Sequence, residues 1–106
     1  MTEDKGILKI NEIDDALRLL PGWAREGNFL KKDFYFKDFK EVNTFIAHLS
    51  FSILKLNHHP DFSFLGRDKK MSVKLTTHST GCITEADLNF AKFLNEWCGS
   101  RKPGFG

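Results

Sequence analysis

The chain has 106 residues, the size of one ordinary domain, and its 16 basic and 14 acidic residues give a formal net charge of +2. The two signs of charge are nearly balanced and the basic residues are dispersed. This pattern argues against nucleic acid or an anionic membrane surface as a direct partner. No apolar run approaches the roughly 20 residues of a membrane span and the polar start resembles no signal or transit peptide, so we expect one soluble domain over 1–106 in the cytoplasm, with the nucleus as a second possible compartment. In that setting Cys82 and Cys98 are expected to be free thiols.

The first third of the chain predicts a short helix and a hairpin. Asn11 is a good N-cap for a helix over about 12–20, which a Pro-Gly pair ends. Residues 23–36 are rich in aromatic and β-prone side chains on both sides of Gly27 and Asn28. A turn at that pair, between two strands, is the pattern of a β-hairpin.

A long helix follows, and its ends are marked on both sides. Asp38 can cap it, with Glu41 placed for a capping box. Asn57 can adopt the left-handed conformation of a C-terminal cap, and Pro60 disfavours helical geometry at His59. One face carries the apolar residues Val42, Phe45, Ile46, Leu49, Ile53 and Leu56.

The same helix has a second apolar set on roughly the opposite side, formed by Ala47, Phe51 and Leu54. A helix that packs on a sheet needs only one apolar face. The second set therefore favours a partner helix from another copy of the chain, and the alternative is cover by the chain's own terminal segments.

Two further strands, at 61–65 and 71–77, and a final helix over about 85–97 complete the pattern. Thr84 and Asp87 form a second capping box at the start of that helix. Its apolar face is expected to consist of Ala86, Phe90, Phe93, Leu94 and Trp97.

The predicted order is α-β-β-α-β-β-α. Four short strands joined by tight connections indicate an α+β domain, a four-stranded antiparallel sheet with helices packed on one face. The ordered core should extend over about 7–98, and the tail 99–106 has too little patterning to order itself.

Three of the four histidines occur in the two stretches "NHHP" and "TTHS". His58 and His59 follow the carbonyl end of the long helix, whose partial negative charge favours a protonated imidazole. His78 has the parity of the polar positions of the preceding strand and should lie away from the packed face. Because the unperturbed pKa of histidine is about 6.5, such residues can give and take protons near neutral pH.

These histidines leave three interpretations open on residue chemistry alone. They can be acid–base groups, they can be structural, or they can be zinc ligands with an open fourth position. Contiguous histidines are poor ligand spacing, and no carboxylate or thiolate obviously completes a metal set. A metal-free acid–base enzyme is therefore the preferred interpretation, and it names no substrate.

The stretches "NHHPDFSF" and "VKLTTHSTGCITEADLNFAKFL", with "LPGW" and "FYFKDFKEVNTFIAHL" upstream, resemble the pterin-4a-carbinolamine dehydratase family over about 13–97. The resemblance implies loss of water from 4a-hydroxytetrahydropterin to give quinonoid dihydropterin, in tetrahydrobiopterin recycling, with no metal and no cofactor. Animal members also act as a dimerisation cofactor for a transcription factor, which is the alternative function.

The resemblance also implies site residues. His58, His59 and His78 form the catalytic set, in which His58 and His78 transfer protons and His59 binds and orients the substrate. The positions that grip the pterin are Asn57, His58, His59, Thr76, Thr77, His78 and Ser79. Asp87 matches the family aspartate, but its capping-box position explains it structurally, and it is kept out of the catalytic set.

Two departures from the family pattern concern the rim of the site and the subunit contacts. Leu54 stands where an acidic or polar residue is common, and the loop 66–70 is about two residues longer than usual. Family members form dimers that extend the sheet and tetramers through the long helices. We expect a tetramer through Ala47, Phe51 and Leu54, with a dimer as the fallback.

Overall fold

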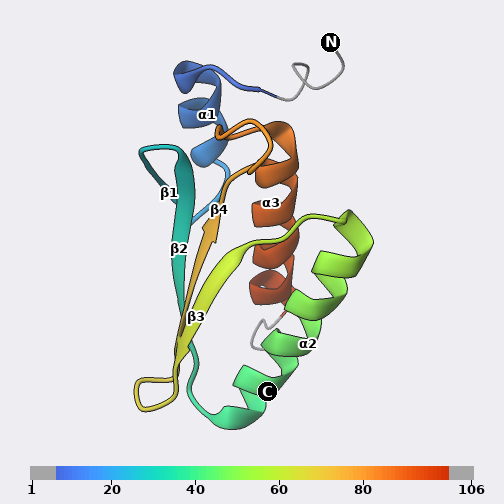
Figure 1. The fold of residues 1–106 in the computed structure, drawn as a ribbon. Helices are drawn as coiled ribbons and strands as arrows, with labels where there is room; N and C mark the ends of the chain where they lie inside the picture. The colour runs from blue at the N-terminus through green and yellow to red at the C-terminus, as the bar shows by residue number, and fades with distance from the viewer. Residues whose placement is uncertain (1–6, 101–106) are drawn as a thin grey trace.

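The computed structural model describes residues 7–100 of the chain, and the side chains of residues 7–97. The order of its elements confirms the α+β prediction (Figure 1). They are α1 (Ile10–Leu17), β1 (Ala24–Glu26), β2 (Phe29–Tyr35), α2 (Phe39–Leu56), β3 (Asp61–Leu65), β4 (Lys70–Leu75) and α3 (Glu85–Ser100). Helix α3 includes the first two residues of the predicted tail, and residues 101–106 of that tail lie outside the described residues.

The four strands form one sheet in the order β1-β2-β4-β3, and every neighbouring pair is antiparallel. Hairpin β1-β2 closes at the predicted pair, where Gly27 has a φ of 58°. Positive φ at the first of two loop residues suits a tight hairpin and favours glycine there. Helices α2 and α3 lie on one face of the sheet, and α1 lies beyond one end of it (Figure 1).

The core lies between the sheet and this helix layer. Leu30 and Phe34 of β2 and Val73 of β4 are at most 3% exposed, and they meet Phe45 and Phe90 of the two helices, which have no exposed surface. The rings of Phe34 and Phe45 lie 4.6 Å apart between centroids. Burial of aromatic side chains gives this small domain much of its apolar contact area.

The prediction for the first helix is wrong by two residues at its start and three at its end. Lys9, rather than Asn11, is the N-cap, and its backbone N–H donates to Glu12 Oε1 at 2.8 Å. The helix ends early because Leu20 N donates to Leu17 O at 3.1 Å, which closes a tighter turn before the Pro-Gly pair.

Both predicted ends of α2 are confirmed. Glu41 N donates to Asp38 Oδ1 at 2.9 Å, and Asn57 has φ 51° and ψ 47°, the left-handed conformation. Val42 and Phe45 are buried as expected, but Ile46 is 42% exposed because it lies at the edge of the core-facing stripe.

The described residues contain no helix long and apolar enough to cross a membrane. Cys82 is a free thiol, as predicted, and the side chain of Cys98 lies outside the described residues.

Candidate active site

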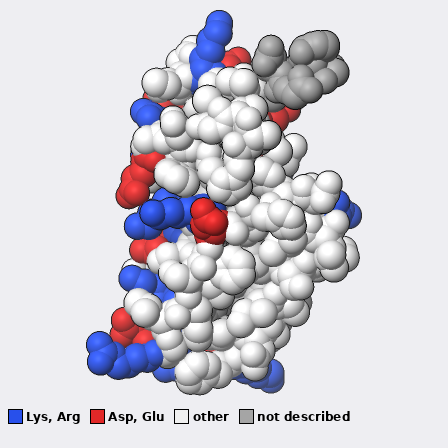
Figure 2. Space-filling view, in the orientation of Figure 1, with Lys and Arg blue, Asp and Glu red and all other residues white. Residues whose placement is uncertain are grey.

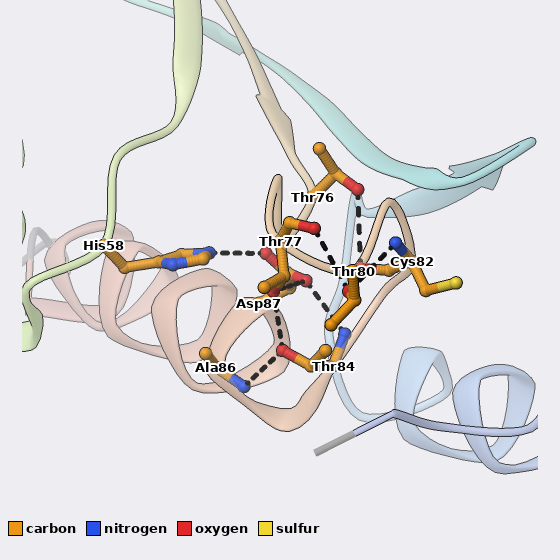
Figure 3. Close-up of polar contacts among 8 residues, drawn as sticks. All are labelled: His58, Thr76, Thr77, Thr80, Cys82, Thr84, Ala86 and Asp87. Carbon is orange, nitrogen blue, oxygen red and sulfur yellow. Dashed lines mark hydrogen bonds and ion pairs between the residues drawn. The ribbon is translucent and has the colours of Figure 1, made fainter. Parts of the chain in front are cut away.

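Two stretches that are distant in the sequence meet at one end of the helix layer. One is the stretch that follows α2, and the other runs from the end of β4 into the first turn of α3. Figure 3 shows the side chains that join them: His58 reaches Asp87 from one side, and Thr77 and Thr84 lie on the other.

Asp87 is the centre of this cluster. It has no exposed surface, yet three groups donate hydrogen bonds to its carboxylate. His58 Nε2 lies 2.6 Å from Oδ1, while Thr77 Oγ1 and Thr84 N each lie 2.9 Å from Oδ2 (Figure 3). The position of Asp87 in the first turn of α3 adds the positive end of the helix dipole. A buried carboxylate is stable only with such donors around it.

His58 is held by the geometry of the helix end. Asn57, in the left-handed conformation, ends α2, and the next side chain, His58, reaches Asp87 of α3. The His58 side chain is 14% exposed, and its ring centroid lies 6.0 Å from that of Phe90. Because an ionised carboxylate only accepts hydrogen bonds, Nε2 carries the hydrogen that Asp87 receives.

His59 and His78 are arranged differently from His58. Both side chains are exposed, and neither has a hydrogen bond or ion pair with any other described residue. Asn57 and Ser79 are exposed as well. The three predicted histidines therefore divide into one that is bonded to Asp87 and two with exposed side chains.

The turn that carries His78 explains its exposure. Strand β4 ends at Leu75, two residues before the predicted end, so the expected strand parity does not apply to His78. Thr77 N instead donates to Cys82 O at 3.1 Å, which closes a turn over residues 78–81. His78 lies in this turn and projects from it rather than from the sheet.

The two threonines before His78 point inward. Thr76 is 7% exposed, and its Oγ1 donates to Cys82 O at 3.5 Å. Thr77 is half-buried and contacts Asp87. The predicted binding segment 76–79 thus has a buried half and an exposed half.

Asp87 is the site residue that sequence reasoning missed. Its predicted capping box is confirmed in part: Thr84 N donates to Oδ2, but Thr84 Oγ1 accepts from Ala86 N and not from Asp87 N. The bond to Oδ2 leaves Oδ1 for His58. The helical phase would have revealed it: Asp87 lies one turn before Phe90 and Ala91 on the buried stripe of α3, whereas Ala86, expected on that stripe, is exposed. An acidic residue on a core-facing stripe requires a partner.

Neither a separate pocket nor a metal-ligand set in the described residues adds a residue to this cluster. A hollow of about 440 Å³ lies near the end of α1 and the middle of α3, and it contains no histidine. No three His, Cys, Asp or Glu side chains in the described part of the chain gather as a metal-ligand set.

Comparison with known proteins identifies the family of the chain. Residues 7–97 match the model of the family described as Pterin 4 alpha carbinolamine dehydratase. A protein of Sulfurisphaera tokodaii, provisionally named a pterin-4-alpha-carbinolamine dehydratase, is 39% identical over 85 residues, covering 80% of this chain and 89% of that protein. One from Thermomicrobium roseum with the same provisional name is 36% identical over 89 residues, covering 79% and 94%.

Solved structures extend the similarity to three dimensions. A transcriptional coactivator/pterin dehydratase from Brucella melitensis has a TM-score of 0.79 at 33% identity, covering 85% of this chain and 96% of that chain. A pterin dehydratase-like protein, described as a RuBisCO assembly factor in the alpha-carboxysome, has a TM-score of 0.59 at 22% identity, covering 71% and 87%, and shows the fold alone. With its family model, its relatives and its fold in agreement, the chain belongs to the pterin 4 alpha carbinolamine dehydratase family.

Proposed function

We propose that the protein removes water from a 4a-hydroxytetrahydropterin to give quinonoid dihydropterin by histidine general acid–base catalysis. The observation that carries this proposal is His58, held 2.6 Å from the buried carboxylate of Asp87 in a chain of the dehydratase family. A carboxylate that orients an imidazole is a recurring device of acid–base catalysis.

The reaction needs two proton transfers and no electron acceptor. The hydroxyl on C4a leaves with its bonding electrons and takes up a proton to become water, and the hydrogen on N5 leaves as a proton when the C4a–N5 double bond forms. We assign these transfers to His58 and His78, and the orientation of the pterin to His59. Exposure supports a contact between the substrate and His59 and His78, because both side chains are exposed, whereas His58 is bonded to Asp87.

The exposed polar groups beside the histidines are suited to the pterin ring. We assign its binding to Asn57 and to the segment 76–79, whose main chain and side chains can meet the donors and acceptors of the heterocycle. The physiological role that fits this chemistry is recycling of the pterin cofactor after aromatic amino-acid hydroxylation, in the cytoplasm.

Dehydration of synthetic 4a-hydroxytetrahydropterin, followed spectroscopically with and without a chelator, tests the proposal. We expect chelator-insensitive activity, and we expect kcat to fall by about 10²–10⁴-fold in His58→Ala and in His78→Ala, the usual contribution of a general acid or base. The matched control is His48→Gln. His48 is the fourth histidine, it donates to Phe93 O at 2.9 Å between α2 and α3, and glutamine can keep that bond.

The other outcomes separate the competing functions. Activity that disappears with EDTA would favour a metal-dependent site, and no activity from folded protein would favour an interaction protein. The observation that favours the interaction protein as a second candidate is the Brucella melitensis relative, which is described as both coactivator and dehydratase.

We also infer that the protein assembles through the second apolar face of α2. On this face Phe51 is 55% exposed and Leu54 is 79% exposed, and the Phe51 ring lies 6.3 Å from that of Phe93 on α3. In Figure 2 the charged side chains gather toward the sheet side, and the surface over α2 is mostly uncharged. An apolar surface of this kind is typical of a protein–protein interface.

The edge of the sheet supports a second contact between copies. Strand β3 is at one edge, and Phe62 and Leu65 on it are 51% and 50% exposed. An exposed edge strand with apolar side chains is suited to pairing with another strand. A dimer through β3 and a tetramer through α2 would bury both surfaces.

A further inference from the structure

We infer that Thr77 is a positioning residue, whose hydroxyl fixes the Asp87 carboxylate that in turn sets the tautomer of His58. The inference rests on the proposed function only in giving His58 a proton to transfer. Its basis is the chain of contacts from Thr84 Oγ1 to Thr77 Oγ1 at 2.7 Å, and from Thr77 Oγ1 to Asp87 Oδ2 at 2.9 Å (Figure 3).

The direction of these hydrogen bonds follows from the groups involved. A threonine hydroxyl has one hydrogen, and an ionised carboxylate can only accept. The Thr77 hydrogen therefore goes to Asp87, and the contact between the two threonines is donated by Thr84. The oxygen of Thr84 also accepts from Ala86 N at 3.2 Å, which fixes it at the start of α3.

This arrangement fixes both oxygens of Asp87. Oδ2 accepts hydrogen bonds from the Thr77 hydroxyl and from the Thr84 backbone N–H, and Oδ1 is left to accept from His58 Nε2. The hydrogen of neutral His58 is thereby held on Nε2, and its Nδ1 is free of hydrogen. Nδ1 is then the atom that accepts a proton from the substrate and returns it, while Nε2 remains on the carboxylate throughout.

The same geometry separates Thr77 from the ligand-binding part of its segment. Its only hydrogen is committed to Asp87, and its oxygen already accepts from Thr84. The side chain of Thr77 therefore acts through Asp87 and His58, and pterin contacts from this stretch come from its exposed neighbours, His78 and Ser79.

Kinetics of two variants test the role. Thr77→Val keeps the side-chain shape and loses the hydroxyl, and Thr77→Ser keeps the hydroxyl. We expect kcat to fall by about 10-fold or more in Thr77→Val with KM within about two-fold, the order expected when one hydrogen bond to a charged group is lost. We expect Thr77→Ser to stay within about three-fold of the parent kcat, because its hydroxyl can reach the same carboxylate.

A second readout needs no substrate. In full-length protein labelled with ¹⁵N-histidine, long-range ¹H–¹⁵N correlation spectra show which ring nitrogen of His58 carries the hydrogen, and a His58→Gln sample assigns its signals. We expect hydrogen on Nε2 in the parent and in Thr77→Ser, and a mixture of tautomers in Thr77→Val. Thr80→Val is the structural control, because among the described residues Thr80 Oγ1 bonds only main-chain groups of the same turn. The tautomer should stay unchanged in this variant.

Three results would overturn the inference: hydrogen on Nδ1 of parental His58, an unchanged kcat in folded Thr77→Val, or a rise in KM alone, which would return Thr77 to pterin binding. If Thr77→Val does not fold, the parental and Thr77→Ser spectra still decide the tautomer. If the parent has no dehydratase activity, the proposed function fails, while the spectra still support or reject the role of Thr77.

Discussion

Asp87 combines full burial with three donated hydrogen bonds, and this combination makes a prediction for stability. In Asp87→Ala we expect the free energy of unfolding to fall by roughly 3 kcal/mol. About 1 kcal/mol comes from the lost helix cap, and the rest comes from donors left without an acceptor in the interior. Urea denaturation followed by circular dichroism measures the change.

Asp68→Ala is the matched control, because Asp68 is an exposed carboxylate in the loop before β4 and its contact with Arg67 is 4.0 Å long. That variant should change stability by less than about 0.5 kcal/mol. A loss below about 1 kcal/mol in Asp87→Ala would mean that water replaces the carboxylate, and that the cluster is less closed than its burial indicates.

At this scale the sequence revealed the histidines more readily than the group that orients one of them. His58 and His78 stand out because three of the four histidines of this small domain occur in two short motifs. Asp87 did not, since a local explanation, the capping box with Thr84, accounted for it completely. The bond to His58 spans 29 residues and depends on how α2 and α3 pack, which no local pattern contains.

Among the elements, α2 offers a test at its C-terminal end. Asn57 has positive φ, which alanine adopts at a cost of about 1–2 kcal/mol and glycine adopts freely. We expect Asn57→Ala to lower the free energy of unfolding by about 1 kcal/mol, and Asn57→Gly to leave it unchanged or slightly raised, in the same urea assay.

Asn43 provides a control with the opposite order. It is exposed within the same helix, where alanine is preferred to glycine by about 1 kcal/mol. If alanine were better than glycine at position 57 as well, the left-handed cap would not govern that end of α2. His58 would then owe its direction to other contacts.

The elements also show which predictions local chemistry supports. Both ends of α2 were predicted correctly because caps involve residues three or four apart in the chain. The end of β4 was not, because its strand pattern continues into residues whose backbone instead bonds to Cys82. The phase of α3 was misjudged at Ala86 because the buried stripe includes a charged residue, which an apolar pattern cannot show.

For the whole molecule, the unresolved question at the sequence level was what covers the second face of α2. No described segment of the chain covers it: Phe51 and Leu54 keep more than half of their surface exposed. The apolar set was predictable from helical spacing, but spacing does not distinguish a partner copy from the chain's own ends. A measurement of mass does.

The double variant Phe51→Glu with Leu54→Glu should halve the mass of the assembly in light scattering. A tetramer would become a dimer, and a dimer that forms through α2 would become a monomer. Each interface would then bring together four added carboxylates, two from each copy, where apolar surface is buried, and burial of unpaired charge is strongly unfavourable. Leu19→Glu is the control. Leu19 is 82% exposed, as open as Leu54, but it belongs to the segment that follows α1, and α1 lies apart from α2 (Figure 1). A mass that stays unchanged in the double variant, or that falls equally in Leu19→Glu, would exclude the α2 face as the specific interface. Activity that survives in the smaller assembly would further show that the reaction needs no group supplied across the α2 interface.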